Sequence, residues 1–159
     1  MGTKVLQVSR WMALAGWLAT VPAHGQTRLP VFAQYPAGAP YWGKPVAPRL
    51  VPGTAAWHFR TRIREASRPP VNFAGHYVLA SWGCGAECLI FALIDCKTGI
   101  VQFDTPTVCC WGTAVPHNFE PIYGRLDSRL LVLTGLLNEA GPSGTHYFAF
   151  SHGQLSPLR

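Results

Sequence analysis

Apolar, aromatic and β-branched residues dominate the chain after Pro70, and their pattern predicts strands rather than helices. The run from Leu89 to Ile94 is almost continuously apolar, which indicates a strand that is buried on both faces. Turn residues at 95–99, 127–128 and 152–153 separate neighbouring strands, and Gly99 supplies the positive φ that a tight turn needs. Successive hairpins of this kind predict an antiparallel meander. Its expected strands are residues 72–82, 88–95, 100–103, 122–126, 130–136, 145–150 and 154–158.

Helical periodicity occurs between Thr54 and Ser67, where apolar residues form a stripe at positions 56, 59, 63 and 66. Thr54 is a suitable N-cap, and the dipeptide Pro69–Pro70 ends the pattern. Arginines line another face of this expected helix at positions 60, 64 and 68. The fold class is therefore mainly β (α+β): a small sheet or barrel-like meander, with one N-terminal amphipathic helix packed against it.

Proline recurs six times between residues 26 and 53, which excludes regular helix and central strand there. Large rings are interleaved with these prolines at Phe32, Tyr35, Tyr41 and Trp42. A free linker does not usually carry so many rings, so we expect an extended arm packed across the domain. The alternative is a flexible linker.

The first 25 residues have the layout of a cleavable secretory signal. Lys4 and Arg10 supply a positive start, an apolar run follows from Trp11 to Val21, and small residues flank a cleavage point after Gly25. The apolar run is shorter than the ~20 residues that span a bilayer, so no stable membrane span is expected after cleavage. The domain organisation is then a signal peptide (1–25), a proline-rich arm (26–53) and a single β-rich domain (54–159), in the periplasm or secreted.

The charge balance favours anionic partners. The chain carries thirteen Lys and Arg against seven Asp and Glu, and Lys4 and Arg10 belong to the leader, so eleven basic residues remain after cleavage. Much of this surplus is one cluster of arginines at positions 60, 62, 64 and 68. Such a cluster attracts anionic envelope components or proteins. Nucleic acid is not an expected partner, because export separates the protein from it.

Five cysteines lie in the expected mature part, at positions 84, 88, 96, 109 and 110. In an exported protein they are interpreted first as disulfides, and an odd number leaves at least one unpaired. The preferred pairing joins Cys84 to Cys88, with a second bridge from Cys96 to Cys109 or Cys110. Because neighbouring side chains on a strand point to opposite faces, Cys109 and Cys110 are expected in different environments.

No motif in the sequence fixes a reaction, and no cofactor is expected. One alternative is a metal-binding or thiol-redox protein centred on the Cys84–Cys88 loop, with His76 and His117 as further ligands or as bases. The spacing of these residues matches neither a zinc finger nor a thioredoxin-like site. A hydrolase with paired carboxylates is a further alternative. The sequence contains neither a phosphate-binding loop nor a nucleophile elbow.

Four segments carry a resemblance to known proteins: Asn72–Tyr77 (NFAGHY), Trp82–Cys88 (WGCGAEC), Asp95–Gly99 (DCKTG) and Asp127–Leu131 (DSRLL). In these segments the chain resembles a group of small uncharacterised bacterial exported proteins, from about Phe59 to the C-terminus. The resemblance implies a bacterial periplasmic setting. It implies no catalytic residues, because the group has no assigned activity.

These observations favour a non-enzymatic binding module, stapled by disulfides, over an enzyme. Exposed aromatic and arginine side chains carry much of the affinity in protein interfaces. The candidate binding residues are therefore Tyr41 and Trp42 from the proline-rich arm, and Arg60 and Arg64 from the expected helix.

Overall fold

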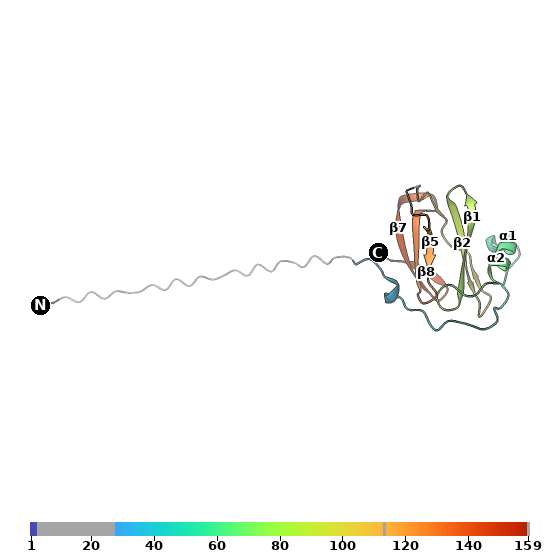
Figure 1. Cartoon of the computed structure of the whole chain (residues 1–159), viewed down its shortest axis with the longest axis horizontal. Helices are drawn as coiled ribbons and strands as arrows, with labels where there is room; N and C mark the ends of the chain where they lie inside the picture. The colour runs from blue at the N-terminus through green and yellow to red at the C-terminus, as the bar shows by residue number, and fades with distance from the viewer. Residues whose placement is uncertain (3–27, 113, 159) are drawn as a thin grey trace.

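The computed structural model describes residues 1–2, 28–112 and 114–158 (Figure 1). The expected signal peptide and its cleavage point, apart from the first two residues, lie outside the described residues. Within the described part of the chain, no helix has both the length and the apolar character needed to cross a membrane.

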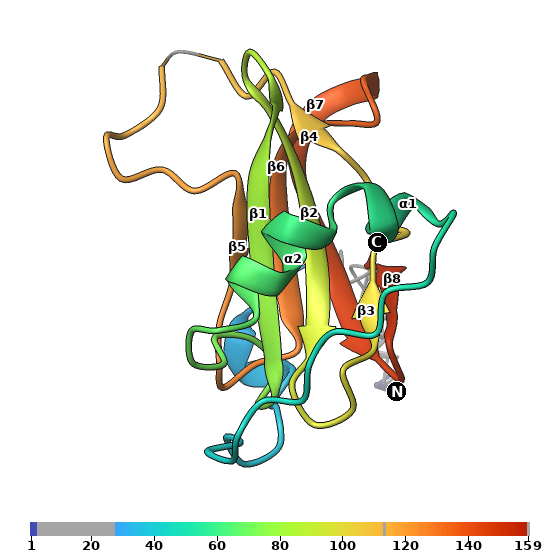
Figure 2. The ribbon, with the colours of Figure 1, turned by 90° about the vertical axis from the view of Figure 1, so that its right-hand side faces the viewer.

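One antiparallel sheet forms the domain, which confirms a mainly β fold (Figure 2). Its strands follow the order β1-β2-β4-β6-β7-β8, while β3 pairs with β2 and β5 pairs with β6. The first and last strands of this order do not pair with each other, so the sheet is open rather than a closed barrel. The strands are β1 (Tyr77–Gly85), β2 (Cys88–Asp95), β3 (Val101–Gln102), β4 (Val108–Cys109), β5 (Ile122–Gly124), β6 (Leu130–Leu137), β7 (Ala140–Ser151) and β8 (Gln154–Pro157).

The three turns expected from the sequence join β2 to β3, β5 to β6 and β7 to β8. In the first, the Asp95 carboxylate accepts hydrogen bonds from the Lys97 amide and the Thr98 hydroxyl, each at 2.8 Å. β7 begins earlier than the expected strand at 145–150, because residues 140–144 also belong to it. The turn between β6 and β7 falls on Asn138 and Glu139, both with positive φ.

The expected single helix is two short ones, α1 (Ala55–His58) and α2 (Arg60–Ala66), separated at Phe59. The Thr54 hydroxyl accepts a hydrogen bond from the Trp57 amide at 3.3 Å, which confirms Thr54 as the N-cap. Ile63 is fully buried, so α2 covers one face of β1 and β2 in the expected orientation (Figure 2).

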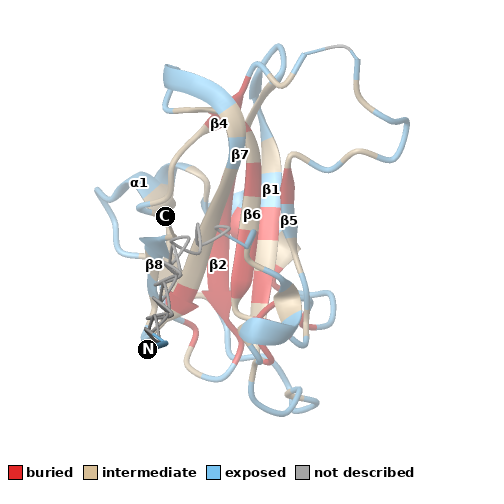
Figure 3. Ribbon diagram, turned by 90° about the vertical axis from the view of Figure 1, so that its left-hand side faces the viewer, coloured by how far each residue is buried: buried red, intermediate tan, exposed pale blue. Residues whose placement is uncertain are grey.

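The two faces of β1 and β2 pack into two separate cores. Phe91 and Leu93 of β2 point into a cluster with β6 residues such as Leu131 and Leu133. Ala92 and Ile94, which alternate with them, contact the helix side with Ile63. β2 is therefore buried on both faces from Phe91 to its C-terminal end, as its continuous apolar run predicts (Figure 3).

The sheet consists of two halves, and among the described strands β4 is the one that pairs with both of them. Val108 and Cys109 pair with Leu89 and Cys88 of β2 on one side, and with residues 136–137 of β6 on the other. Towards the other end of the sheet, β2 pairs with β3 and β6 pairs with β5 instead. The first core cluster fills the space between the two halves.

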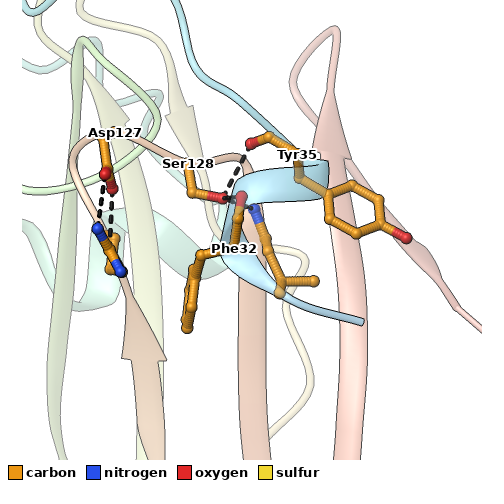
Figure 4. Close-up of polar contacts among 6 residues, drawn as sticks. Phe32, Tyr35, Asp127 and Ser128 are labelled. Atoms are coloured by element: carbon orange, nitrogen blue, oxygen red, sulfur yellow. Dashed lines mark hydrogen bonds and ion pairs between the residues drawn. The ribbon is translucent and has the colours of Figure 1, made fainter. Parts of the chain in front are cut away.

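A proline-rich arm, residues 28–53, crosses the end of the domain opposite the β1–β2 tip (Figure 2). It begins with the short 3-10 helix η1 (Phe32–Gln34). The buried Ser128 hydroxyl shares its proton between the carbonyl oxygens of Phe32 and Tyr35, each 2.9 Å away (Figure 4). Farther along, the amides of Val46 and Arg49 donate to the carbonyls of Cys96 and Gly99, at 2.9 and 2.7 Å.

Candidate functional site

A pocket of about 280 Å³ lies where the arm passes the chain that follows α2. Tyr41, Trp42 and Pro45 line it from the arm, and residues 68–71 line it from the other side. Its walls are mostly apolar rings and prolines, with the Arg68 side chain as the cationic member. The structure therefore brings two of the expected binding residues, Tyr41 and Trp42, into one hollow.

Tyr41 and Trp42 differ sharply in how they are held. The Tyr41 amide donates to the Gly75 carbonyl at 2.8 Å, and its hydroxyl donates to the Lys44 carbonyl at 3.2 Å. The Lys97 ammonium lies 5.8 Å from the centre of the Tyr41 ring, within range of a cation–π contact. Trp42, the next residue, is 77% exposed. The anchored Tyr41 therefore fixes the backbone next to Trp42, whose indole faces solvent.

The four arginines between positions 60 and 68 are all exposed. The ion pairs within the described residues are His76–Asp95 and Arg125–Asp127, so none of these arginines is paired with a described carboxylate. Glu65 lies among them and leaves a surplus of three positive charges. The cluster is therefore a source of positive potential on the outer side of α2.

The expected arginines are not equivalent in the structure. Arg60 donates to the Trp57 carbonyl at 3.2 Å, and its guanidinium lies 5.2 Å from the centre of the Trp57 ring, so it belongs to the α1–α2 junction. Arg64 lies one helical turn farther on, and Arg68 is the arginine that lines the pocket. Sequence reasoning missed Arg68 and Lys97 as site residues, although Arg68 belongs to the arginine cluster that the sequence shows.

The cysteines lie at two opposite ends of the sheet. A disulfide joins Cys84 to Cys88 at the β1–β2 tip, with Cα atoms 5.2 Å apart, which confirms the preferred pairing. The expected second bridge is wrong: Cys96, Cys109 and Cys110 are thiols. Cys88 pairs with Cys109, whereas Cys96 follows the far end of β2, about 26 Å away at about 3.3 Å per residue. A disulfide tolerates only about 7 Å between its Cα atoms.

Cys96 is a buried thiol of the helix-side core, where burial and then the nearby Asp95 carboxylate raise its pKa. Cys109 is buried in β4, and Cys110 is exposed just beyond the strand. The expected difference in environment is confirmed, because Cys109 is buried and Cys110 is exposed, but their Sγ atoms do not point apart and are 2.6 Å from each other. Cys110 has φ +57°, so the chain leaves the strand there and side-chain alternation ends.

The alternative ligand set His76, Cys84, Cys88 and His117 is not assembled among the described residues. His76 precedes β1 and Cys84 lies near its other end, so eight residues of extended chain, roughly 26 Å, separate them. His117 is exposed in the loop between β4 and β5. His76 instead has its Nε2 atom 3.8 Å from the Asp95 carboxylate. Partial burial lowers its pKa, Asp95 opposes that shift, and Lys97 adds to it.

Two more pockets follow the seams between the halves of the sheet. One, of about 340 Å³, lies between the β2–β3 side and β7–β8, and the other, of about 320 Å³, lies between β1 and β5. The described lining of the first includes one carboxylate, Asp104, and that of the second includes one, Glu120. Glycoside hydrolysis by paired carboxylates needs two in one cleft, so neither seam supports that chemistry.

Comparisons with protein-family models, with curated proteins and with solved structures found nothing that matches this chain.

Proposed function

We propose that the chain is an exported, non-enzymatic binding module of the bacterial periplasm. Its binding surface is formed by Tyr41, Trp42 and Arg68 at the arm pocket, and continues to Arg64 on α2. The partner is an anionic protein or an anionic component of the cell envelope. Both the leader-like N-terminus and the resemblance to exported bacterial proteins support this setting.

The exposed indole of Trp42 carries this proposal. A tryptophan that is 77% exposed leaves a large apolar ring in water, although burying such a ring would be favourable. Tyr41 beside it is anchored through its amide and its hydroxyl, so the backbone at Trp42 is fixed before any partner arrives. Pre-positioned aromatic side chains lose little conformational entropy on binding, which makes them effective contact residues.

The charges next to the indole select the partner. Arg68 lines the same pocket as Trp42, Lys97 lies over the Tyr41 ring, and Arg64 is exposed on α2. Since no described carboxylate pairs with these arginines, an incoming anion does not have to displace one. Tryptophan and arginine are the residue types that most often dominate interface affinity.

The proposal is tested with protein purified from the periplasm of a bacterium that expresses the full chain. We expect its N-terminus to be Gln26, the residue after the expected cleavage point. The immobilised protein is exposed to purified peptidoglycan, to phosphatidylglycerol vesicles and to soluble envelope proteins in separate assays. Binding that weakens with added salt is expected in one of them, because the site is cationic.

Substitutions then locate the contact surface. Trp42→Ala should weaken binding by at least about tenfold, as expected for a contact residue at the centre of an interface. Val46→Ala is the matched control, because Val46 is an exposed apolar residue of the same arm that does not line the pocket. Arg68→Ala should weaken binding and reduce its salt dependence more than Arg62→Ala does, because Arg62 does not line the pocket. Unchanged binding in both Trp42→Ala and Tyr41→Ala would exclude the arm as the contact surface.

A further inference from the structure

Cys109 and Cys110 present two thiols on one short piece of backbone. Their Sγ atoms are 2.6 Å apart, closer than sulfur atoms that merely touch and not far above the ~2.05 Å of a disulfide bond. The positive φ of Cys110 produces this geometry, since a continuing strand would turn the two side chains to opposite faces.

The surrounding sheet holds the pair in place. Cys109 is paired with Cys88 on one side and with Leu136 on the other. The Cys110 amide donates to the Glu87 carbonyl at 3.0 Å, within the loop that the Cys84–Cys88 disulfide closes. Both cysteines are therefore anchored through backbone hydrogen bonds.

The two thiols differ in access to solvent. Cys110 is exposed, whereas Cys109 is 2% exposed. The contact with Cys110, assisted by burial, raises the pKa of the Cys109 thiol to about 11. Because the thiolate is the attacking species, Cys110 is the group that meets an incoming disulfide first.

We propose that Cys109 and Cys110 form a redox-active pair that closes reversibly to a disulfide between neighbouring residues. This site goes beyond the binding surface of the proposed function. Its oxidant is another disulfide, either a small-molecule one or one in a protein. The Cys110 thiolate attacks one sulfur of that disulfide, forms a mixed disulfide and expels the first thiol. Cys109 then gives up its proton, attacks Cys110 Sγ and expels the second thiol.

The exchange is balanced: two cysteine thiols and one external disulfide become one internal disulfide and two external thiols. Consecutive Cα atoms are about 3.8 Å apart, below the usual range for disulfides, and bonds outside that range are easier to reduce. Readily reduced disulfides are the ones that act in regulation or exchange. The reverse step therefore needs only an ordinary thiol.

Tryptic mass mapping of the native protein tests the proposal. Cleavage after Lys97 and Arg125 places Cys109 and Cys110 together on peptide 98–125. Cys84, Cys88 and Cys96 fall on peptide 65–97, because the Arg68–Pro69 bond resists trypsin. The protein is incubated in buffers that range from reduced to oxidised glutathione, and its remaining thiols are alkylated before digestion. Under oxidising conditions we expect peptide 98–125 without alkyl groups, lighter than the dithiol form by two hydrogen atoms.

Two other results would overturn the proposal. One is a peptide 98–125 that is alkylated at both cysteines across the whole range of buffers. The other is a cross-link between peptides 98–125 and 65–97, which would mean that Cys109 or Cys110 pairs with another cysteine of the chain.

Single substitutions test the order of attack. Cys109→Ser should trap one glutathione on Cys110, because no second thiol remains to expel it. Cys110→Ser should trap none, because Cys109 is buried. Cys96→Ser is the control and should close the disulfide like the unsubstituted protein. The assigned roles would be wrong if Cys110→Ser carried glutathione on Cys109, or if Cys109→Ser carried none on Cys110. The mass mapping of the unsubstituted protein does not depend on how these variants fold.

Discussion

His76 lies beside the start of β1, where burial and two opposite charges act on one imidazole. Its ring packs against that of Tyr77, with centroids 4.4 Å apart, and faces Asp95 and Lys97. Burial is the largest influence and lowers the pKa of His76 in the folded protein, although Asp95 pulls in the other direction. The unfolded chain keeps the ordinary histidine pKa of about 6.5.

This difference predicts that His76 makes the fold less stable in mild acid. Below about pH 6.5 the unfolded chain takes up the proton more readily than the folded protein does, so the free energy of unfolding falls. Above that pH both states are neutral at His76, and the effect disappears. Urea unfolding at intervals from about pH 7.5 to about pH 5.5 measures it. The slope of the unfolding free energy against pH should be smaller in His76→Gln than in the unsubstituted protein. It should be unchanged in His117→Gln, whose side chain is exposed. Equal slopes in all three proteins would refute this role of His76.

β4 lies between the two halves of the sheet and pairs with both of them. Its two residues, Val108 and Cys109, connect the two halves of the sheet. Gly135 of β6 makes this connection possible, because its φ is +137° and a Cβ atom there would overlap the Cys109 carbonyl oxygen. Gly144 of β7 pairs directly with Gly135, yet a Cβ atom on Gly144 would meet nothing within 4 Å.

These two neighbouring glycines give a matched test of the junction. Gly135→Ala should lower the free energy of unfolding by at least about 1–3 kcal/mol, through backbone strain and the displacement of β4. Gly144→Ala should change it by less than about 0.5 kcal/mol, as a surface substitution. Denaturant unfolding of the two variants measures the difference. Equal stability would mean that β4 does not need the close approach at Gly135.

The sequence predicts elements well where local chemistry determines them. Asp95, Thr98 and Gly99 form a turn from their own hydrogen bonds and φ, so its position could be read in advance. β4 has only two residues in a proline-rich segment, and it is a strand because β2 and β6 pair with it. The turn at Asn138–Glu139 was missed because a positive φ is unusual for glutamate, while the nearby glycines at 141 and 144 resemble a turn.

The candidate sites were predictable only in part, for the same reason. Tyr41 and Trp42 could be chosen as exposed rings, but the hollow that they share with Arg68 depends on how the arm crosses the domain. The Cys84–Cys88 bridge is local and was predicted. The approach of Cys109 to Cys110 depends on one left-handed residue, which the sequence does not mark with glycine.

The halves of the molecule are held together at both ends. At the end where the arm crosses, the amides of Ala74 and Gly75 donate to the carbonyls of Arg125 and Leu126, at 3.2 and 2.8 Å. β4 joins the halves near the Cys84–Cys88 tip, and the arm joins them at the other end (Figure 2). There the arm is bonded to the β5–β6 turn through Ser128 and to the β2–β3 turn through the carbonyls of Cys96 and Gly99. The arm therefore links the two halves of the domain in addition to holding Trp42.

Ser128→Ala tests the connection through the arm. Ser128 is 1% exposed, donates to the arm and accepts a hydrogen bond from the buried Leu130 amide at 3.1 Å. Its loss leaves the Leu130 amide without that acceptor, which should cost about 1–3 kcal/mol of unfolding free energy. Ser81→Ala, at an exposed position of β1, should cost less than about 0.5 kcal/mol.

Amide hydrogen exchange shows whether loss of the Ser128 hydroxyl destabilises the arm itself. In the unsubstituted protein the Ala37 amide, which donates to the Asp127 carbonyl at 2.9 Å, should exchange more slowly than the exposed Lys44 amide. In Ser128→Ala the protection of Ala37 should fall, while that of Arg49, bonded to the β2–β3 turn, should fall less. If Ala37 and Arg49 exchanged as fast as Lys44 in the unsubstituted protein, the arm would not be packed in solution. Tyr41 and Trp42 would then not be held ready for a partner, and the binding surface would have to form on contact.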